Sequence, residues 1–131
     1  MSLGKTTLLI ASSSFVVYGL AFLCMPVWAS SFVGLELPTA SARIDARATY
    51  GGFFLGTAIF WAMCARRAVW LRAGLASLAI IMGGFILGRA VGIIVDGEPN
   101  AAIYVLLGGE IVGLALALVA LKQQGSETGR G

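Results

Sequence analysis

Four long apolar runs constrain the fold of this chain more than any other feature of its sequence. They cover about residues 8–28, 48–65, 71–95 and 101–121. A helix needs about 20 predominantly apolar residues to cross the hydrocarbon core of a bilayer, and each run is near that length. Only 11% of the residues are charged, against about 25% in a typical soluble domain, so most of the surface must contact lipid. We therefore predict one all-α membrane domain, residues 1–131, built as a bundle of four transmembrane helices.

The ends of the runs carry residues typical of helix ends at a membrane surface. Pro26 falls in the last turn of the first predicted helix, where it can end the helix with little disruption. Trp28 suits the membrane–water interface. The second run is the shortest, and its helix can begin earlier, at Asp45 or Ala46. The remaining segments are one long connection, two short ones and a polar, Gly/Ser-rich tail that we expect to be flexible: 29–47, 66–70, 96–100 and 122–131.

Positive charge is concentrated on one side of the predicted bundle. Four helices place both termini on the same side, which then holds most of the basic residues: Lys5, Arg66, Arg67, Arg72, Lys122 and Arg130. The other side holds Arg43 and Arg47, together with acidic residues: Glu36, Asp45, Asp96 and Glu98. Loops rich in Lys and Arg stay in the cytoplasm. The sequence therefore predicts a multi-pass membrane protein with both termini cytoplasmic.

The first apolar run has an alternative interpretation. Lys5, the apolar stretch and the segment Val27-Trp28-Ala29 resemble a secretory signal followed by a cleavage site. The stretch is long for such a signal, so we favour a retained transmembrane helix.

Several classes of function fit the composition poorly. The net charge is +3, but the basic residues flank the apolar runs, so they favour a role in topology over nucleic-acid binding. The chain has no histidine, which removes the commonest metal ligand and general base. We expect no metal, no cofactor and no Ser-His-Asp arrangement. Cys24 and Cys64 fall near opposite faces of the membrane, too far apart for a disulfide, so we expect two free thiols.

Glycines recur at four-residue spacing in three of the runs. Small residues allow helix backbones to approach closely in lipid, where burial of apolar side chains contributes little. The predicted helix-packing positions are Gly52, Gly56, Gly84, Gly88, Gly92, Gly109 and Gly113. One interpretation is a dimerisation face. The other, which we favour, is packing within the same four-helix bundle.

Two ionisable residues lie inside the apolar runs. Arg89 is in the third run and Glu110 in the fourth. A charge at the bilayer centre costs about 2.5–3.5 kcal/mol on insertion scales, so each needs a partner or water. The third and fourth helices form an antiparallel hairpin, in which the depths of the two residues differ by roughly 4–5 Å at the rise of an α-helix. We therefore predict that Arg89 and Glu110 pair with each other.

The first connection offers further polar groups at the same side of the membrane. Asp45 and Arg47 precede the second run, and Tyr50 lies about one turn further in. With Arg89 and Glu110 they form a candidate polar cluster. It is interpreted either as a site for an anionic or polar ligand or for protons, or as an ion-pair network that fixes helix register.

The part of the chain that follows Arg47 resembles a known family. The resemblance rests on residues in three of the runs and in the last turn: Thr49-Tyr50-Gly51-Gly52, Gly88-Arg89, Asp96-Gly97 and Glu110. Together they are similar to a family of small bacterial four-span membrane proteins known only as a domain of unknown function. The resemblance is best over 47–121. It implies four helices and a bacterial inner membrane, implies no reaction, and directs attention to four residues: Tyr50, Arg89, Asp96 and Glu110.

Three functional hypotheses follow. The first is a non-enzymatic accessory or scaffold subunit whose partners are the lipid bilayer and either a second copy or another membrane protein. The second is a carrier of ions or small molecules that uses Glu110 with Arg89, although a carboxylate paired with arginine is a poor proton carrier. The third is a membrane enzyme that acts on a lipid or quinone, for which the only obvious acid–base groups are Asp45, Tyr50, Arg89 and Glu110.

Overall fold

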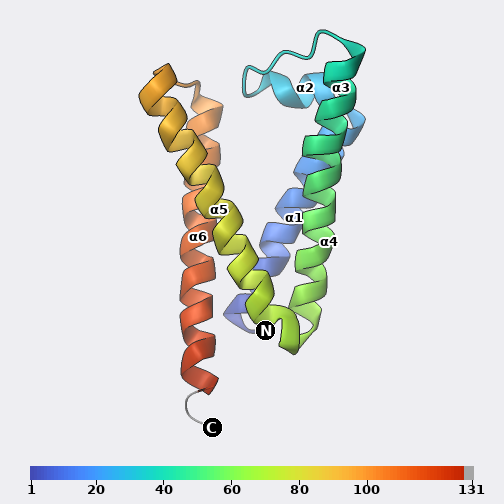
Figure 1. Cartoon of the computed structure of the whole chain (residues 1–131). Helices are drawn as coiled ribbons and strands as arrows, with labels where there is room; N and C mark the ends of the chain where they lie inside the picture. Colours follow the sequence, from blue (N-terminus) through green and yellow to red (C-terminus); the bar gives the residue numbers. More distant parts are fainter. Residues whose placement is uncertain (129–131) are drawn as a thin grey trace.

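The computed structural model describes residues 1–128, and in that part of the chain all regular structure is helical (Figure 1). The elements are α1 Leu3–Cys24, α2 Pro26–Ser31, α3 Ala40–Ala46, the π-helical η1 Arg47–Gly52, α4 Phe53–Arg66, α5 Ala68–Asp96 and α6 Ala101–Thr128. Because α3, η1 and α4 follow one another without a break, they form a single long helix, Ala40–Arg66. Four helices are therefore long and apolar enough to cross a membrane, which confirms the predicted all-α class and the number of spans.

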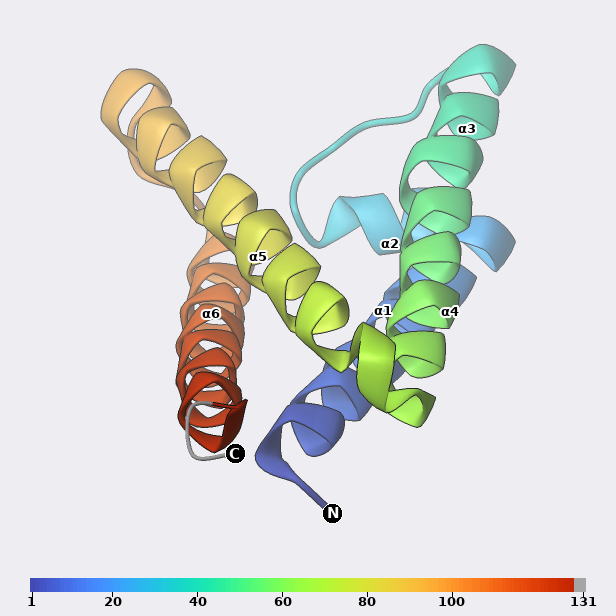
Figure 2. The ribbon, with the colours of Figure 1, turned by 60° about the horizontal axis from the view of Figure 1, so that its bottom comes forward.

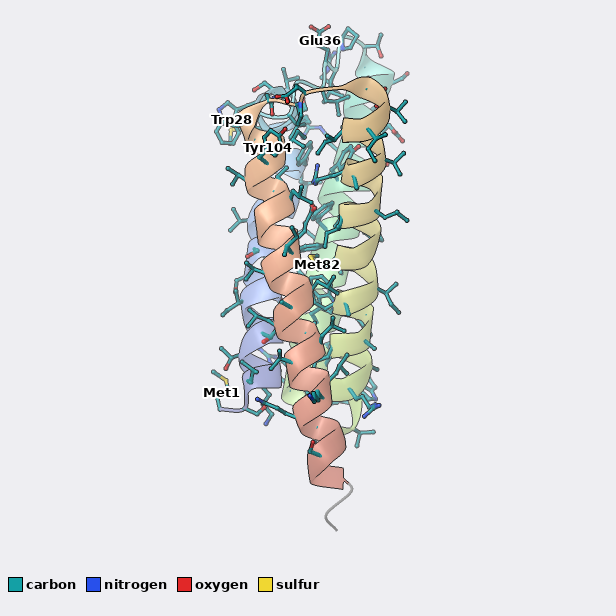
Figure 3. The ribbon with its side chains drawn as sticks, turned by 90° about the vertical axis from the view of Figure 1, so that its left-hand side faces the viewer. Met1, Trp28, Glu36, Met82 and Tyr104 are labelled. Carbon is teal, nitrogen blue, oxygen red and sulfur yellow. The ribbon has the colours of Figure 1, made fainter. Side chains whose placement is uncertain are left out.

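The helices are arranged as two antiparallel hairpins. One hairpin pairs α1 with α4, and the other pairs α5 with α6. We call the end where α1 begins and α6 ends the termini end, and the end with α2 and the α5–α6 connection the loop end. The hairpins meet near the termini end, and α5 leans away from α3 and α4 toward the loop end in both Figure 1 and Figure 2. Figure 3 shows Met1 and Glu36 at these opposite ends, with Met82 between them.

The buried core lies where the two hairpins meet. Leu8 of α1, Trp61 of α4 and Leu75 of α5 are fully buried there. The indole Nε1 of Trp61 donates to Ser77 Oγ on α5 over 3.0 Å. The ring of Phe15 on α1 lies 4.6 Å from that of Trp61. Aromatic packing and one cross-helix hydrogen bond thus join three spans.

Close backbone approach in this core depends on glycines other than those in the predicted stripes. A Cβ atom on Gly74 of α5 would lie 2.5 Å from Cys64 Cβ and 2.7 Å from Leu8 Cδ1. A Cβ atom on Gly19 of α1 would lie 2.7 Å from Leu55 Cγ. All three distances are shorter than carbon atoms normally approach, so a larger residue at either position would force its neighbours to shift. These glycines provide the tight contacts that stabilise helix packing in lipid.

The first span differs from its predicted bounds of 8–28. It starts at Leu3 and ends at Cys24, because Met25 leaves the helical conformation with φ −132° and Pro26 begins the separate helix α2. Proline has no N–H to continue the ladder but fits the first turn of a new helix. Trp28 therefore lies on α2, and the predicted place of Pro26 in the last turn of the first helix is wrong.

The second span begins earlier than either 48 or 45. Thr39 caps the helix start, since its Oγ1 accepts from the N–H of Ala42 over 3.1 Å. Apolar runs do not predict this start, because residues 43–47 include three charged side chains. At the other end of the chain, α6 continues through Thr128, so most of the tail 122–131 is helical. Residues 129–131 lie outside the described residues.

Candidate functional site

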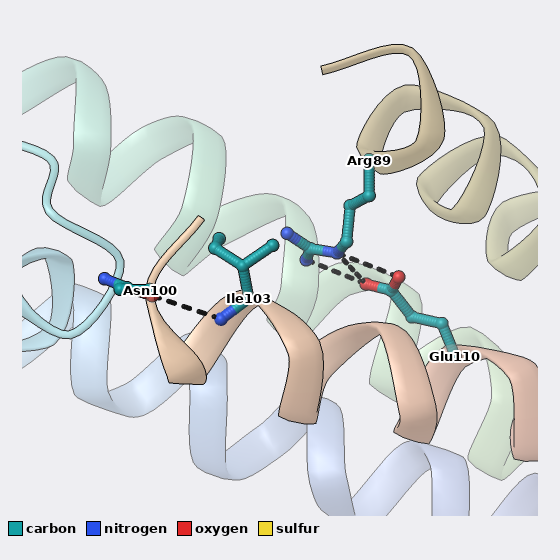
Figure 4. Close-up of polar contacts among 4 residues, drawn as sticks. All are labelled: Arg89, Asn100, Ile103 and Glu110. Atoms are coloured by element: carbon teal, nitrogen blue, oxygen red, sulfur yellow. Dashed lines mark hydrogen bonds and ion pairs between the residues drawn. The ribbon is translucent and has the colours of Figure 1, made fainter. Parts of the chain in front are cut away.

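Arg89 and Glu110 form the one ion pair among the described side chains, residues 1–126. Arg89 Nε lies 2.9 Å from both carboxylate oxygens of Glu110, and Nη2 lies 2.8 Å from Oε1. Figure 4 shows the guanidinium of α5 reaching across to the carboxylate of α6. The prediction that these two residues pair is confirmed.

The ion pair is largely buried, so each charge depends on its partner. The Glu110 side chain is 10% exposed and the Arg89 side chain 23%. Arginine binds a carboxylate strongly when two donors of its planar fork are used together. Each charge therefore satisfies the other in a setting where either one alone would be costly. Nη1 of Arg89 makes no hydrogen bond within the described part of the chain.

The other three members of the predicted cluster lie apart from this pair. The Tyr50 ring packs 5.0 Å from that of Phe22 on α1, and Nη1 of Arg47 donates to the backbone oxygen of Leu23. Asp45 is exposed and forms no ion pair among the described side chains, residues 1–126. No hydrogen bond within those residues joins any of these three side chains to Arg89 or Glu110. The five residues thus form two groups, because α5 leans away from η1 at the loop end.

Arg47 of the second group borders a hollow that the sequence pattern did not predict. An open hollow of about 550 Å³ lies between α2 and α3. Its lining includes Met25, Pro26, Val27, Trp28, Arg43 and Arg47. The break at Met25 turns α2 toward α3 and so creates the hollow. The spacing of Arg43 and Arg47, four residues apart, was the available signal, since residues so spaced share one face of a helix.

The predicted glycine stripes mostly face outward. A Cβ atom on Gly56, Gly84, Gly88 or Gly109 would meet no atom within 4 Å. The interpretation that these four pack within the bundle is therefore wrong. A Cβ on Gly113 would lie 3.3 Å from Met82 Sδ, so that glycine does face a neighbouring helix. Gly52 and Gly92 are the two remaining predicted positions. Their Cβ atoms would make only ordinary contacts with neighbours in their own helices, at 3.9 and 3.8 Å.

Comparison with known proteins identifies a family. The family described as "Domain of unknown function (DUF4345)" matches residues 4–121, so the chain belongs to it, as the resemblance implied. No curated protein and no solved structure matches the chain.

Proposed function

We propose that this member of the DUF4345 family is a non-enzymatic membrane subunit that packs in the bilayer with a second copy or with a larger membrane complex. The proposal includes an inner-membrane location with the termini end in the cytoplasm. Basic residues at that end support this orientation under the positive-inside rule: Lys5, Arg66, Arg67, Arg72 and Lys122.

The outward glycines of α5 and α6 carry the proposal. Glycine in a helix interior costs about 1 kcal/mol relative to alanine. At Gly74 and Gly19, tight contacts within this chain explain why no larger residue is present. At Gly84, Gly88 and Gly109 the space that a side chain would occupy is open. Outward small residues allow another helix to approach the backbone closely. Close approach of a partner helix would explain glycine at these outward positions, as close approach of α4 explains it at Gly74.

The ion pair supports the same proposal. It joins α5 to α6 without help from the other hairpin, so the two helices present their outer faces as one rigid unit. A bidentate pair uses both carboxylate oxygens of Glu110. This leaves the pair suited to holding helix register.

A second candidate function, binding or transport of a small polar molecule, is favoured by one observation. Nη1 of Arg89 is left without a partner in the described residues, and the side chain is partly exposed. A ligand oxygen could accept from it. The two candidates differ in what they require of the charges: a carrier needs Arg89 and Glu110 themselves, whereas a packing subunit needs only a stable hairpin.

The test enlarges the outward face without touching the core. Gly84→Leu and Gly88→Leu add bulk where no atom lies within 4 Å, so each variant should fold. Val17→Phe adds bulk to an exposed residue of α1 and serves as the matched control. Native mass spectrometry after gentle extraction from the membrane then reports which copies or partner proteins stay bound.

We expect the glycine variants to lose the partner or second copy that the wild type and Val17→Phe retain. A wild-type protein that is extracted only as a monomer would refute the packing proposal. Unchanged assembly of both glycine variants would do the same. Assembly lost equally in Val17→Phe would show that bulk anywhere on the surface is disruptive, and would also count against a specific face.

A further inference from the structure

Arg43 and Arg47 place two guanidinium groups on one side of the hollow between α2 and α3. Nη1 of Arg43 donates to the backbone oxygens of Leu37 and Pro38 over 3.2 and 3.3 Å. Nη1 of Arg47 donates to the backbone oxygen of Leu23. All of these acceptors are neutral. Among the side chains that the structure describes, residues 1–126, neither arginine has a carboxylate partner, so both positive charges remain unpaired there.

The hollow has a pronounced apolar rim. Met25 and Trp28 are each 53% exposed, and the Trp28 ring meets that of Phe32 edge-on with centroids 4.8 Å apart. Tryptophan at the end of a transmembrane helix lies at the level of the lipid headgroups. The hollow therefore combines cationic donors with an apolar surface at the depth where a phospholipid has its phosphate and the start of its acyl chains.

From this arrangement we propose that the hollow between α2 and α3 binds one anionic phospholipid of the leaflet at the loop end. The phosphate accepts hydrogen bonds from the remaining donors of Arg43 and Arg47. The upper part of an acyl chain lies against Met25, Val27 and Trp28. Two like charges four residues apart on a helix repel each other, and a phosphate between them replaces that repulsion with two attractions.

The distribution of basic residues adds an independent argument. The positive-inside rule disfavours arginine on the non-cytoplasmic side, yet Arg43 and Arg47 lie at the loop end, opposite the other flanking basic residues. Arg47 has a structural task, because Pro26 leaves carbonyls at the end of α1 without intrahelical donors and Arg47 supplies one. Arg43 caps no helix, and its hydrogen bonds to two loop carbonyls use only Nη1. An anionic ligand gives both residues a common role.

The test is lipid retention by the intact protein. Wild type is delipidated in detergent and titrated with phosphatidylglycerol or phosphatidylcholine, and bound lipids are counted by native mass spectrometry. A basic residue near an anionic membrane surface contributes about fivefold in affinity, equivalent to ~1 kcal/mol. Arg43→Gln should therefore weaken phosphatidylglycerol binding about fivefold, and Arg43→Gln/Arg47→Gln about 25-fold.

The control pair Arg66→Gln/Arg72→Gln removes the same charge from exposed positions at the termini end. It should change binding less than about twofold, while Arg43→Lys/Arg47→Lys should keep most of the affinity. Arg43→Gln keeps the cap on Leu23, so it tests the site even where the double variant fails to fold. Equal losses in the control pair would overturn the proposal, as would equal binding of both lipids. Displacement of the lipid by millimolar inorganic phosphate would also overturn it, by assigning the hollow to a free anion.

Discussion

Removing one charge of the Arg89–Glu110 pair should destabilise the protein far more than removing both. The two side chains share three short contacts of 2.8–2.9 Å. Breaking a buried pair by removing one partner costs about 3–5 kcal/mol, because the other charge stays behind unpaired. Arg89 is 23% exposed, which lowers that figure, so we expect about 2–4 kcal/mol for Arg89→Met and for Glu110→Leu.

The double variant Arg89→Met/Glu110→Leu should behave differently. Apolar residues of similar volume often replace a buried ion pair at no net cost, and in lipid they also contact acyl chains without penalty. We expect its free energy of unfolding to lie within about 1 kcal/mol of the wild type. The two single losses would sum to about 4–8 kcal/mol, so the coupling energy should be at least about 3 kcal/mol.

The assay is reversible unfolding in mixed micelles by titration with SDS, followed by far-UV circular dichroism. Arg72→Met, an exposed change at the start of α5, is the matched control and should lie within about 0.5 kcal/mol of the wild type. Additive losses in the double variant would refute the argument that the pair is mutually compensating. Single variants as stable as the wild type would show that water or lipid headgroups already satisfy each charge.

Four further outcomes follow from other contacts of the bundle. Gly74→Ala should lower the free energy of unfolding by about 1–3 kcal/mol through overpacking, while Gly84→Ala should raise it by up to about 1 kcal/mol through helix propensity, both measured by the same titration. Ser12→Ala should cost about 1 kcal/mol, because its hydroxyl donates to a backbone oxygen of α4 over 2.7 Å in a buried position. A polyethylene-glycol maleimide should modify the exposed Cys24 in native membranes and the buried Cys64 only after denaturation, as read from gel shifts.

For three of these predictions the contradicting result can be stated directly. A Gly74→Ala protein as stable as the wild type would contradict the close approach of α5 to α4. A destabilised Gly84→Ala protein in the monomeric state would mean that this face is covered within the chain itself and not by a partner. Rapid native labelling of Cys64 would place that thiol outside the core.

The apolar runs predicted the number of spans well, because lipid requires every crossing helix to be long and predominantly apolar. They predicted the ends poorly. Pro26 was read as the end of one helix, whereas it begins another, since proline fits a first turn as well as it terminates a ladder. The start at Ala40 could not be predicted in this way, because the first turns of this helix carry Arg43, Asp45 and Arg47. High hydropathy identifies a helix only where it lies in lipid.

The candidate site was predictable where both partners lie on neighbouring helices. Arg89 and Glu110 belong to one hairpin, so the helical rise alone placed them at similar depth. Asp45, Arg47 and Tyr50 belong to the other hairpin, and their distance from the pair depends on the angle between hairpins. That angle is set by Gly74, Cys64 and the core around them, which no pattern in the loops encodes. The glycine stripes failed for a related reason: spacing identifies a helix face but not what it faces.

The two proposed interaction surfaces lie on different parts of the molecule. The outward glycines belong to α5 and α6, while the arginine hollow belongs to α2 and α3. At the loop end the hairpins are joined by the hydrogen bond from Asn100 Nδ2 to the backbone oxygen of Phe32, at 3.1 Å. Because that bond involves neither the glycine face nor the arginines, the two surfaces should respond independently. Gly88→Leu should leave phosphatidylglycerol retention unchanged, and Arg43→Gln should leave assembly unchanged. A loss of both properties in either variant would instead mean that lipid and partner share one interface.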